Sequence, residues 1–556
     1  MIASPNALAG HTAPRSALIS VARLVTAYFS EVPDPEQPGQ RVTFGTSGHR
    51  GCAWDRSFNE WHVLSITQAI CDFRRSQGID GPLFLGIDTH ALSEPACASV
   101  LEVLAGNGVE IRLAPRGEYT PTPAISHAIV THNRGRQVGL ADGIVLTPSH
   151  NPPRDGGLKY NPPHGGAAGP DITDRIQLSA NRLLALRLKG VKRISHAMAL
   201  RAETTRTHDF RDAYVRDLAS VIDLDAIRDL KIRMGADAMG GAGVRYWSEI
   251  ADRHRIDLRL VSDVVDPAFA FMPVDWDGKI RMDPSSAFAM SRLIGRREEF
   301  DIAFACDTDH DRHGVVTRGA GLLPSNHYLS VAIEYLFSQR PRWGGGAAVG
   351  KTAVSTQLID RVAQRQGRRL VEMPPGFKWF ADGLHDGSVG FAGEESAGAT
   401  FLRRDGSTWT TDKDGIAAAL LAAEITVRRG RDPGVLYGEL TDSLGCPVAE
   451  RVEAPANAAQ KRRLATLTPR QVVARQLAGE PIEQVVNRVG ASALPLGGIK
   501  VMARNGWFAA RPSGTEDLYK IYAESFLGPS HLACILEEGQ ALVDSALAER
   551  DPIEEP

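Results

Sequence analysis

The sequence is poor in cysteine: it has six in 556 residues, and no two of them form a C-x-x-C pair. This spacing excludes both a disulfide framework and a zinc site built on cysteine pairs. We therefore expect ordinary buried thiols in a reducing compartment, at Cys52, Cys71, Cys97, Cys306, Cys446 and Cys534.

Long apolar runs are also absent. No apolar stretch reaches the roughly 18 residues needed to cross a bilayer. Polar and proline positions such as Pro5, His11 and Arg15 interrupt the segment where a signal peptide would have its apolar core. The sequence therefore predicts a cytoplasmic protein without a membrane partner.

An excess of charge of one sign is absent as well. The chain has 63 basic and 66 acidic residues, a net charge of −3. Nucleic acid or an anionic membrane surface would call for a basic field, so we expect neither partner. A local basic pocket for a small anion stays open, because net charge does not report on it.

Lysine is scarce, with 11 residues against 52 arginines. An ammonium is more compact than a guanidinium and titrates more readily. A retained lysine can therefore mark a site that arginine cannot serve, although chance retention on the surface is the alternative for any single lysine.

What is present is an average globular composition, 43% hydrophobic and 23% charged, in a chain too long for one core. A short apolar strand that ends in a polar, glycine-rich loop and leads into a helix recurs, with strands at 83–87, 143–146, 302–306 and 390–392. This alternation predicts α/β layers with mixed, largely parallel sheets, whose ligands bind beyond the carboxyl ends of the strands.

The last hundred residues differ, because two strands flank residues 511–515 and a helix near 532–547 closes the chain. This pattern predicts a smaller α+β domain. We place the domain boundaries near residues 205, 325 and 450. The predicted domains are 1–205, 206–325, 326–450 and 451–556.

Ser149 lies in the loop directly after strand 143–146, between Pro148 and His150. A hydroxyl in such a turn can be an activated nucleophile where a base or a metal lowers the cost of deprotonation. A serine that caps a following helix would have the same sequence context. Spacing alone leaves both interpretations open.

Asp307, Asp309 and Asp311 alternate after strand 302–306, so their carboxylates can converge on one hard cation. An EF-hand also begins D-x-D-x-D but needs glycine and glutamate at places that Arg312 and Arg318 occupy here. Three carboxylates leave positions open for water or a phosphate oxygen, as Mg²⁺ prefers. A solvated acidic turn is the alternative.

Residues 511–515, Arg-Pro-Ser-Gly-Thr, combine a guanidinium, two hydroxyls and a glycine that frees backbone N–H groups. This set suits a phosphate, which accepts many charge-assisted hydrogen bonds, although Ser-Gly-Thr is also common in turns. Glu394 and Ser396 offer acceptors suited to sugar hydroxyls.

Residues 345–352 satisfy the G-x-x-x-x-G-K-[ST] pattern of a nucleotide-binding P-loop. That motif must follow a strand, whereas Pro341 and Arg342 come just before it here, and residues 347–354 have the pattern of a strand themselves. We predict that the match is accidental. A P-loop NTPase that uses Lys351 is the rival enzyme class, and nucleotide binding would be its mark.

Eight segments together resemble the α-D-phosphohexomutase superfamily, and within it the bacterial glucose-specific phosphoglucomutases. The likeness runs over nearly the whole chain, and all eight in this order are far more specific than any one of them. The segments are residues 45–50, 147–152, 156–163, 307–312, 376–380, 393–398, 411–415 and 511–516.

The resemblance implies four domains around a central cleft, three α/β and one α+β, each with one loop of the site. It makes Ser149 the phosphorylated serine, and it implies a Mg²⁺ site formed by a phosphoserine oxygen with Asp307, Asp309 and Asp311. Candidates for proton transfer and charge stabilisation are Arg50, His150, Lys159 and Lys413. The implied contacts to the sugar and its non-reacting phosphate are Arg312, Gly376, Lys378, Glu394, Ser396, Arg511, Ser513, Gly514 and Thr515.

The implied reaction interconverts glucose 1-phosphate and glucose 6-phosphate. Phosphoserine would phosphorylate the free hydroxyl, and the resulting glucose 1,6-bisphosphate, which also serves as activator, would turn over and return its other phosphate to Ser149. Such transfer asks a protein mainly for positioning and charge neutralisation. A phosphosugar is the expected partner, with a homodimer left open.

Two departures bear on the substrate. Members that act on mannose or glucosamine phosphates often carry Met or Gln where Glu395 stands, followed by Gly-His at positions 397–398, which are Ala-Gly here. This favours glucose and leaves phosphomannomutase and phosphoglucosamine mutase as alternatives. Lys520 stands where many members have arginine. Outside catalysis, the rival is a phosphosugar-binding sensor, which would need neither the serine nor the metal centre.

Overall fold

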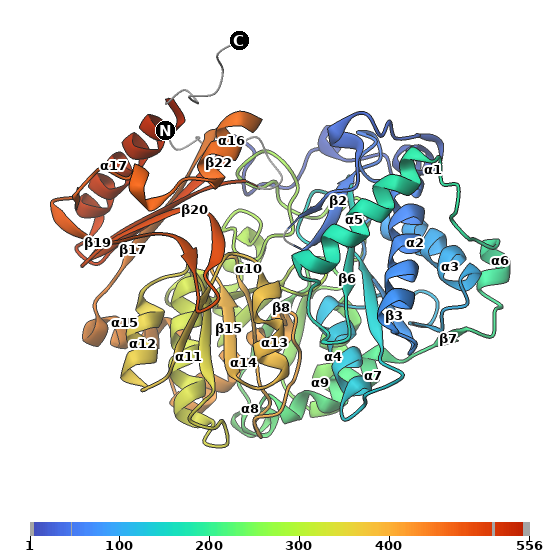
Figure 1. The fold of residues 1–556 in the computed structure, drawn as a ribbon. Helices are drawn as coiled ribbons and strands as arrows, with labels where there is room; N and C mark the ends of the chain where they lie inside the picture. The colour runs from blue at the N-terminus through green and yellow to red at the C-terminus, as the bar shows by residue number, and fades with distance from the viewer. Residues whose placement is uncertain (1–4, 46, 514–517, 549–556) are drawn as a thin grey trace, which may run out of the picture. The chain divides into compact units, whose positions relative to one another are not determined.

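The computed structural model describes residues 5–45, 47–513 and 518–548 (Figure 1). The chain divides into two compact units. The larger comprises Pro5–Ala347 and Phe377–Val435, and the smaller comprises Ala348–Gly376 and the chain from Leu436 onward. The domain boundaries expected near residues 205, 325 and 450 stay predictions.

The first sheet of the larger unit has seven strands in the order β1-β2-β6-β5-β3-β4-β7. Its strands are β1 (Phe44–Gly45), β2 (Gly48–Cys52), β3 (Leu83–Ile87), β4 (Ile111–Leu113), β5 (Asp142–Leu146), β6 (Asp155–Asn161) and β7 (Thr205–Thr207). The helices of this region are α1 (Val21–Ser30), α2 (Glu60–Gln77), α3 (Ser93–Gly106), α4 (Thr122–Asn133), α5 (Pro170–Ala185), α6 (His196–Ala199) and α7 (Phe210–Asp217).

Side chains of β3 alternate between two helical layers, as the pleat of a strand requires. Leu83 and Leu85 belong to the core that α2, α3 and α5 cover. Phe84 points the other way, with its ring centroid 6.1 Å from that of His132 on α4 and 5.8 Å from that of Phe210 on α7. The strand is therefore buried on both faces, which explains its continuous apolar sequence.

Helix α4 lies close to this sheet because two strand positions are glycine. A Cβ atom at Gly86 or Gly143 would come within 2.8 or 2.7 Å of the Ile125 side chain. The close packing helps to fix the first residue of the helix, Thr122, whose backbone N–H donates to the carbonyl oxygen of Asp309 at 2.9 Å. The two glycines that let α4 pack closely thus also help to place Thr122 against the loop that carries Asp307, Asp309 and Asp311, called the acidic loop below.

The second sheet has the order β12-β11-β10-β8-β9. Its strands are β8 (Met234–Asp237), β9 (Leu258–Ser262), β10 (Ile302–Cys306), β11 (His313–Thr317) and β12 (Gly321–Leu322), with helices α8 (Leu224–Leu230), α9 (Val244–His254) and α10 (Ser291–Gly295). The larger unit further contains the pair β15 (Val389–Glu394) and β16 (Gly398–Phe401), with helices α11 (Ser325–Gln339), α13 (Ala381–His385) and α14 (Gly415–Arg429).

Three of the four polar loops lead into a strand, so the expectation that each would lead into a helix was wrong there. The loops after β5, β10 and β15 lead into β6, β11 and β16, each antiparallel to the strand before it. Only β3 leads into a helix, α3. The mixed sheets are confirmed, with more antiparallel pairing than the apolar strands indicated. Short apolar strands look alike in sequence whichever way their neighbours run.

The smaller unit contains the parallel pair β13 (Ala348–Thr352) and β14 (Leu370–Met373) with α12 (Leu358–Arg365). It also contains a sheet in the order β17-β22-β21-β20-β19-β18. These strands are β17 (Val448–Pro455), β18 (Gln476–Leu477), β19 (Glu480–Val489), β20 (Leu494–Ala503), β21 (Gly506–Pro512) and β22 (Leu518–Ser525), antiparallel throughout and packed with α16 (Ala458–Ala465) and α17 (Pro529–Ala548). Helix α15 (Pro433–Leu444) joins the units. The predicted α+β domain is confirmed.

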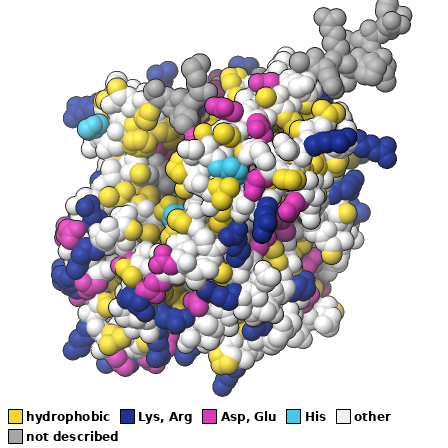
Figure 2. Space-filling model, turned by 90° about the vertical axis from the view of Figure 1, so that its left-hand side faces the viewer, with side chains coloured by type: hydrophobic (Ala, Val, Ile, Leu, Met, Phe, Trp, Pro, Cys, Tyr) yellow, Lys and Arg dark blue, Asp and Glu magenta, His cyan; other side chains and the backbone are white. Residues whose placement is uncertain are grey.

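The structure bears on the predictions about cysteine burial and about membrane-spanning segments. All six cysteines are free, but Cys446 and Cys534 are exposed, so the prediction of buried thiols was wrong for these two. Within the described residues, no helix is both long enough and apolar enough to span a membrane. Figure 2 shows basic and acidic side chains interspersed on the face it draws.

Lys351, the lysine of the P-loop pattern, lies inside strand β13 and is fully buried. Its Nζ forms an ion pair with Asp360, lies 3.5 Å from Glu372 Oε2 and donates to the Thr356 carbonyl oxygen at 3.3 Å. A P-loop lysine must project from a loop toward phosphates. The predicted strand is therefore confirmed, and the Lys351 ammonium is ion-paired with protein carboxylates.

We expect Lys351→Ala to lower the free energy of unfolding by about 3 kcal/mol, because breaking one side of a buried ion pair leaves carboxylates poorly compensated. Calorimetry should detect no ATP binding to either protein, and the activity of the folded fraction should stay within a few-fold of wild type. Exposed Lys189→Ala is the control for loss of a lysine. ATP affinity in the micromolar range that disappears in Lys351→Ala would restore the NTPase alternative.

The buried pair His49 and His62 gives the larger unit a pH dependence. Their rings stack with centroids 5.3 Å apart, and burial lowers the pKa of His49 to about 4 and of His62 to about 3. In the unfolded chain a histidine has a pKa of about 6.5. Between these values the unfolded chain binds more protons, so stability should fall as pH drops from about 6.5 toward 4.

Urea unfolding between pH 7 and pH 4.5 measures this slope. His49→Phe should reduce it by up to about 1.4 kcal/mol per pH unit, the contribution of one proton. The exposed His11→Phe is the matched control and should leave the slope unchanged. An equal slope in wild type and His49→Phe would contradict the assignment.

Candidate active site

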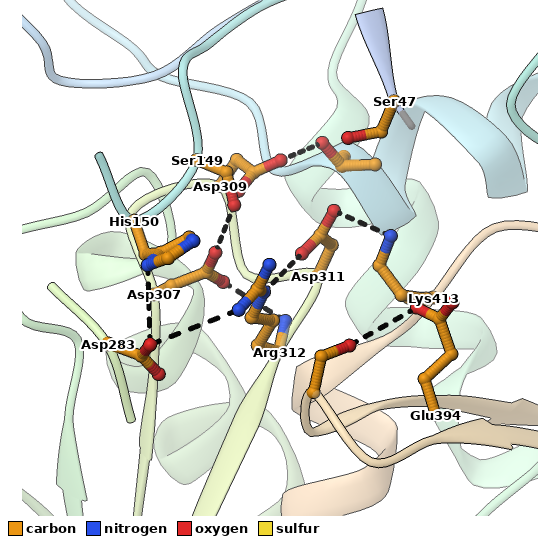
Figure 3. A network of polar contacts seen from close by, with 12 residues as sticks. Ser47, Ser149, His150, Asp283, Asp307, Asp309, Asp311, Arg312, Glu394 and Lys413 are labelled. Carbon is orange, nitrogen blue, oxygen red and sulfur yellow. Dashed lines mark hydrogen bonds and ion pairs between the residues drawn. The ribbon is translucent and has the colours of Figure 1, made fainter. Parts of the chain in front are cut away.

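Ser149 lies in the loop between β5 and β6, and no helix follows it, so the helix-cap alternative was wrong. Its backbone is in the left-handed region, with φ = 57°, and its side chain is buried. The Ser149 N–H donates to Thr147 Oγ1 at 2.8 Å, and its carbonyl oxygen accepts from Thr308 Oγ1 at 2.6 Å. The hydroxyl donates to Asp307 Oδ2 at 2.6 Å (Figure 3). The fold thus holds this strained residue on both sides and aims its hydroxyl at the acidic loop.

Asp307, Asp309 and Asp311 follow β10 and are all buried, so the alternative of a solvated acidic turn was wrong. One carboxylate oxygen from each lies within 4.8 Å of the others. Asp309 Oδ1 and Asp311 Oδ1 have no hydrogen-bond partner within the described part of the chain. Burial, with the charges of Asp309 and Asp311, raises the pKa of Asp307 well above its usual value. Clustered oxygens with unused lone pairs fit a hard divalent cation.

Two lysines offset the negative charge of the acidic loop. Lys159 Nζ on β6 donates to Asp309 Oδ2 at 2.6 Å and to Asp311 Oδ2 at 2.8 Å. Lys413 Nζ lies 3.1 Å from Asp311 Oδ2 (Figure 3). Burial alone would lower both lysine pKa values, but the carboxylates outweigh it and raise them. Both lysines therefore remain cations at neutral pH.

His150 follows Ser149 and faces a different environment. Its Nδ1 lies 3.3 Å from Asp283 Oδ2. Burial, together with the Arg312 guanidinium, lowers the His150 pKa to about 4, so its imidazole is neutral at neutral pH. Arg312 Nη1 lies 4.0 Å from Asp283 Oδ2, and Figure 3 shows Asp283 joined by dashed lines to both His150 and Arg312.

Arg50 on β2 forms no ion pair within 4 Å in the described residues. Its Nη1 donates to Asn151 Oδ1 at 3.1 Å and its Nη2 to Ser47 Oγ at 2.8 Å. Burial and the nearby Arg312 lower its pKa. A half-buried guanidinium with only neutral hydrogen-bond partners is well suited to an anionic ligand.

Glu394 and Ser396 lie at the turn between β15 and β16. Ser396 Oγ donates to Glu394 Oε2 at 3.4 Å, and Glu394 is buried. Gly398 must be glycine because a Cβ there would lie 2.1 Å from Lys413 Cδ. The turn between β15 and β16 and Lys413 are therefore packed directly against each other. Lys378 Nζ lies 5.5 Å from the centroid of the Trp379 ring, and burial lowers the Lys378 pKa.

The remaining predicted residues belong to the smaller unit. Gly376 has φ = 122°, a conformation that favours glycine. Arg511 Nε donates to the Leu496 carbonyl oxygen at 2.8 Å, and the Ser513 N–H donates to the Leu518 carbonyl oxygen at 2.8 Å. Gly514 and Thr515 lie outside the described residues. Strands β21 and β22 flank this loop as predicted.

Sequence reasoning missed several residues of the network. Asp283 contacts His150, and Thr122 Oγ1 donates to Asp309 Oδ2 at 2.5 Å. Thr308 stands between Asp307 and Asp309 in the sequence, and Asp88 directly follows the strand 83–87. The position after a strand could have singled out Asp88, whereas Thr122 and Asp283 are brought in from distant segments and carry no local signal.

Models of one protein family match most of the chain. They describe phosphoglucomutase/phosphomannomutase alpha/beta/alpha domains I, II and III, over residues 41–185, 212–321 and 324–444, and the C-terminal domain, over 451–538. A phosphoglucomutase of Komagataeibacter xylinus is 55% identical over 540 residues, covering 97% of each chain. Phosphoglucomutase 1 of Drosophila melanogaster is 25% identical over 394 residues, which cover 66% of this chain and 67% of that protein.

Solved structures share the fold. The Paramecium phosphoprotein parafusin, a phosphoglucomutase in its open form, has a TM-score of 0.73 at 20% identity, covering 94% of this chain and 98% of the other. A phosphoglucomutase/phosphomannomutase family protein of Burkholderia thailandensis has a TM-score of 0.68 at 21% identity, covering 91% and 98%.

These matches define the class of enzyme as a mutase that moves a phosphoryl group within a phosphosugar. The chain belongs to the phosphoglucomutase/phosphomannomutase family. The predicted superfamily and its isomerase chemistry are confirmed. The role of each site residue stays a prediction, as does the homodimer.

We expect Asp309→Asn to weaken binding of Mg²⁺ or Mn²⁺ by at least roughly tenfold, because even residues behind metal ligands contribute 10–100-fold. Calorimetric titration of the metal alone measures this directly. Asp237→Asn is a matched control, since Asp237 is another buried aspartate at the end of a strand of the same sheet. Equal metal affinity in wild type and Asp309→Asn would contradict the assignment of the triad.

Proposed function

We propose that this enzyme interconverts glucose 1-phosphate and glucose 6-phosphate, with Ser149 as its phosphoryl carrier and glucose 1,6-bisphosphate as intermediate and activator. The observation that carries the proposal is the 2.6 Å hydrogen bond from the Ser149 hydroxyl to Asp307 at the edge of a buried aspartate triad. A protein that only binds phosphosugars has no use for a strained, buried serine held against three carboxylates. The sensor alternative is therefore not favoured.

In the proposed first transfer, the bond between phosphorus and Ser149 Oγ breaks while a bond from phosphorus to the free sugar hydroxyl forms. The hydroxyl proton leaves to a base of the site, and the serine oxygen keeps the electron pair of the broken bond. The second transfer reverses these steps with the other phosphate of the bisphosphate. Both transfers call for fixed positive charge around the phosphoryl group.

The cations around Ser149 support these roles. Lys159 and Lys413 stay protonated beside Asp311, so they can neutralise phosphoryl charge or donate a proton, but they cannot accept one. His150 is neutral and can accept a proton. Arg50 has neutral protein partners and can bind phosphoryl oxygens. We propose Arg50, His150, Lys159 and Lys413 as the catalytic set.

A metal fits the triad of Asp307, Asp309 and Asp311, because Asp309 Oδ1 and Asp311 Oδ1 accept no hydrogen bond among the described residues. We propose Mg²⁺ as the ion, held by these three side chains and by an oxygen of phosphorylated Ser149. When bound, Mg²⁺ would neutralise charge that develops on the transferring phosphoryl group.

For substrate binding we propose Glu394 and Ser396 as acceptors for sugar hydroxyls, with Arg312, Gly376 and Lys378 as further binding residues. We propose Arg511, Ser513, Gly514 and Thr515 as the site of the phosphate that does not react. Glucose is favoured over mannose because the relative named phosphoglucomutase is 55% identical over nearly the whole chain and because Glu395 and Ala397 stand at the distinguishing positions. Free thiols support a reducing compartment, and we propose the cytoplasm.

The test is conversion of glucose 1-phosphate to glucose 6-phosphate by enzyme primed with trace bisphosphate. Ser149→Ala should lose activity by several orders of magnitude, because the covalent route disappears. Intact-mass analysis should find one added phosphate on wild type after priming and none on the variant.

Ser65→Ala serves as the matched control, since Ser65 is a buried serine in α2 that bonds to the backbone of its own helix. It should retain wild-type turnover. Near-normal turnover by Ser149→Ala would exclude Ser149 as the carrier. A higher kcat/KM for mannose 1-phosphate or glucosamine 1-phosphate than for glucose 1-phosphate would replace the proposed substrate with that sugar.

A further inference from the structure

A buried carboxylate outside the proposed catalytic set gathers an unusual number of donors. Asp88 stands in the loop between β3 and α3 and is fully buried. Its Oδ1 accepts from the His90 N–H at 3.0 Å and from Ser93 Oγ at 2.5 Å. Its Oδ2 accepts from His90 Nδ1 at 2.8 Å and from Thr147 Oγ1 at 2.7 Å, and Thr308 Oγ1 lies 3.2 Å from it. A carboxylate with four donors and a further hydroxyl beside it has its position fixed by several segments at once.

Two threonines beside Asp88 hold the backbone of Ser149, one at its N–H and one at its carbonyl oxygen. Thr147 Oγ1 donates to Asp88 and accepts from the Ser149 N–H at 2.8 Å. Thr308 Oγ1 lies within reach of Asp88 and donates to the Ser149 carbonyl oxygen at 2.6 Å. A non-glycine residue at φ = 57° is a strained conformation that persists only where its surroundings determine it. Asp88 therefore orients the Thr147 hydroxyl by a hydrogen bond and lies 3.2 Å from the Thr308 hydroxyl, and these two hydroxyls hold the strained backbone of Ser149.

His90 contacts Asn151, two residues after Ser149 in the same loop. Its Nδ1 faces Asp88 Oδ2 at 2.8 Å, and its Nε2 faces the Asn151 carbonyl oxygen at 3.0 Å. A carboxylate and a carbonyl only accept, so both ring nitrogens must carry a proton and His90 is an imidazolium. Burial would lower the His90 pKa, but Asp88 outweighs it and raises the pKa, which agrees with this geometry.

Asn151 also contacts Arg50, a member of the proposed catalytic set. The Asn151 side-chain oxygen accepts from Arg50 Nη1 at 3.1 Å. Asp88 is thus linked to Ser149 through two threonines and to Arg50 through His90 and Asn151. Thr308 belongs to the acidic loop, so these links also fix the serine loop against the segment that carries Asp307 and Asp309.

We infer that Asp88, with its partner His90, is the positioning residue that holds the Ser149 loop in line for phosphoryl transfer. The inference rests on the proposed function, because it assigns to Asp88 the orientation of the proposed carrier. Asp88 does not touch the Ser149 hydroxyl. It acts through Thr147, Thr308 and His90, so its removal should misplace the serine without removing a reacting group.

The experiment measures how fast glucose 1,6-bisphosphate phosphorylates Ser149 in one turnover, by rapid quench and intact mass, alongside steady-state kinetics. For Asp88→Asn we expect the phosphorylation rate and kcat to fall by roughly 10–100-fold, as expected for a misplacement of about 1 Å. The KM for glucose 1-phosphate should change by less than about threefold, because the hydrogen bonds of Asp88 within the described part of the chain go to none of the proposed substrate-binding residues.

A matched control separates positioning from loss of stability. Glu424 is also a fully buried carboxylate, with Arg340 Nη2 at 2.6 Å and Tyr335 Oη at 2.9 Å as donors, and it has no recorded contact with the serine or aspartate loops among the described residues. Glu424→Gln should lower the melting temperature as Asp88→Asn does, but leave the phosphorylation rate within about twofold of wild type.

Thr147 supplies a second test in case Asp88→Asn does not fold. Thr147→Val keeps the shape of the side chain and removes the hydroxyl that joins Asp88 to the Ser149 N–H, so it should slow phosphorylation. Thr147→Ser restores the hydroxyl and should recover most of the rate. A structural role of side-chain packing alone would not give this rescue.

The outcomes distinguish the two proposals. If wild type is not phosphorylated at Ser149, the proposed carrier is wrong, and with it the inference. If wild type is phosphorylated and both Asp88→Asn and Thr147→Val match its rate, Asp88 has no positioning role and the carrier stands. A fall in rate equal to that of Glu424→Gln would also overturn the inference.

Discussion

The site depends on offsetting the repulsion among three buried aspartates on one short loop. Burial raises the pKa of Asp307, and the charges of Asp309 and Asp311 raise it further. Lys159 and Lys413 come from segments far from the loop and place their ammonium groups beside Asp311. A compact ammonium can lie against two carboxylates at once, as Lys159 does with Asp309 and Asp311, which gives a physical reason for lysine in a chain that mostly uses arginine.

The loop that carries Ser149 contacts the same aspartate loop. Ser149 keeps its left-handed backbone because its N–H and its carbonyl oxygen each have a fixed partner, and its hydroxyl then meets Asp307. Strain of this kind is commonly stored at functional sites, where the surrounding structure over-determines a conformation. The glycines of the sheets contribute at a distance: Gly86 and Gly143 let α4 pack close, and α4 presents Thr122 to Asp309.

Much of this could be predicted from sequence. Strand-end positions located Ser149, the aspartates and the Glu394 turn, because polar residues after apolar strands gather at one edge of a sheet. The strand containing Lys351 was also predictable, because Pro341 and Arg342, and not a strand, come before the P-loop pattern. The direction of β6, β11 and β16 was not, since periodicity does not record which neighbour a strand pairs with. Asp283 and Thr122 escaped notice because only tertiary packing brings them to the site, and the exposure of Cys446 and Cys534 likewise depends on packing.

The most direct test follows labelled phosphate through Ser149. Enzyme labelled at Ser149 by radioactive glucose 1,6-bisphosphate is freed of excess label and mixed with unlabelled glucose 1-phosphate. If Ser149 is the carrier, the label must leave the serine for the sugar at least as fast as the enzyme turns over. Label that remains on Ser149 while glucose 6-phosphate accumulates would show that the reaction bypasses this serine and would contradict the account.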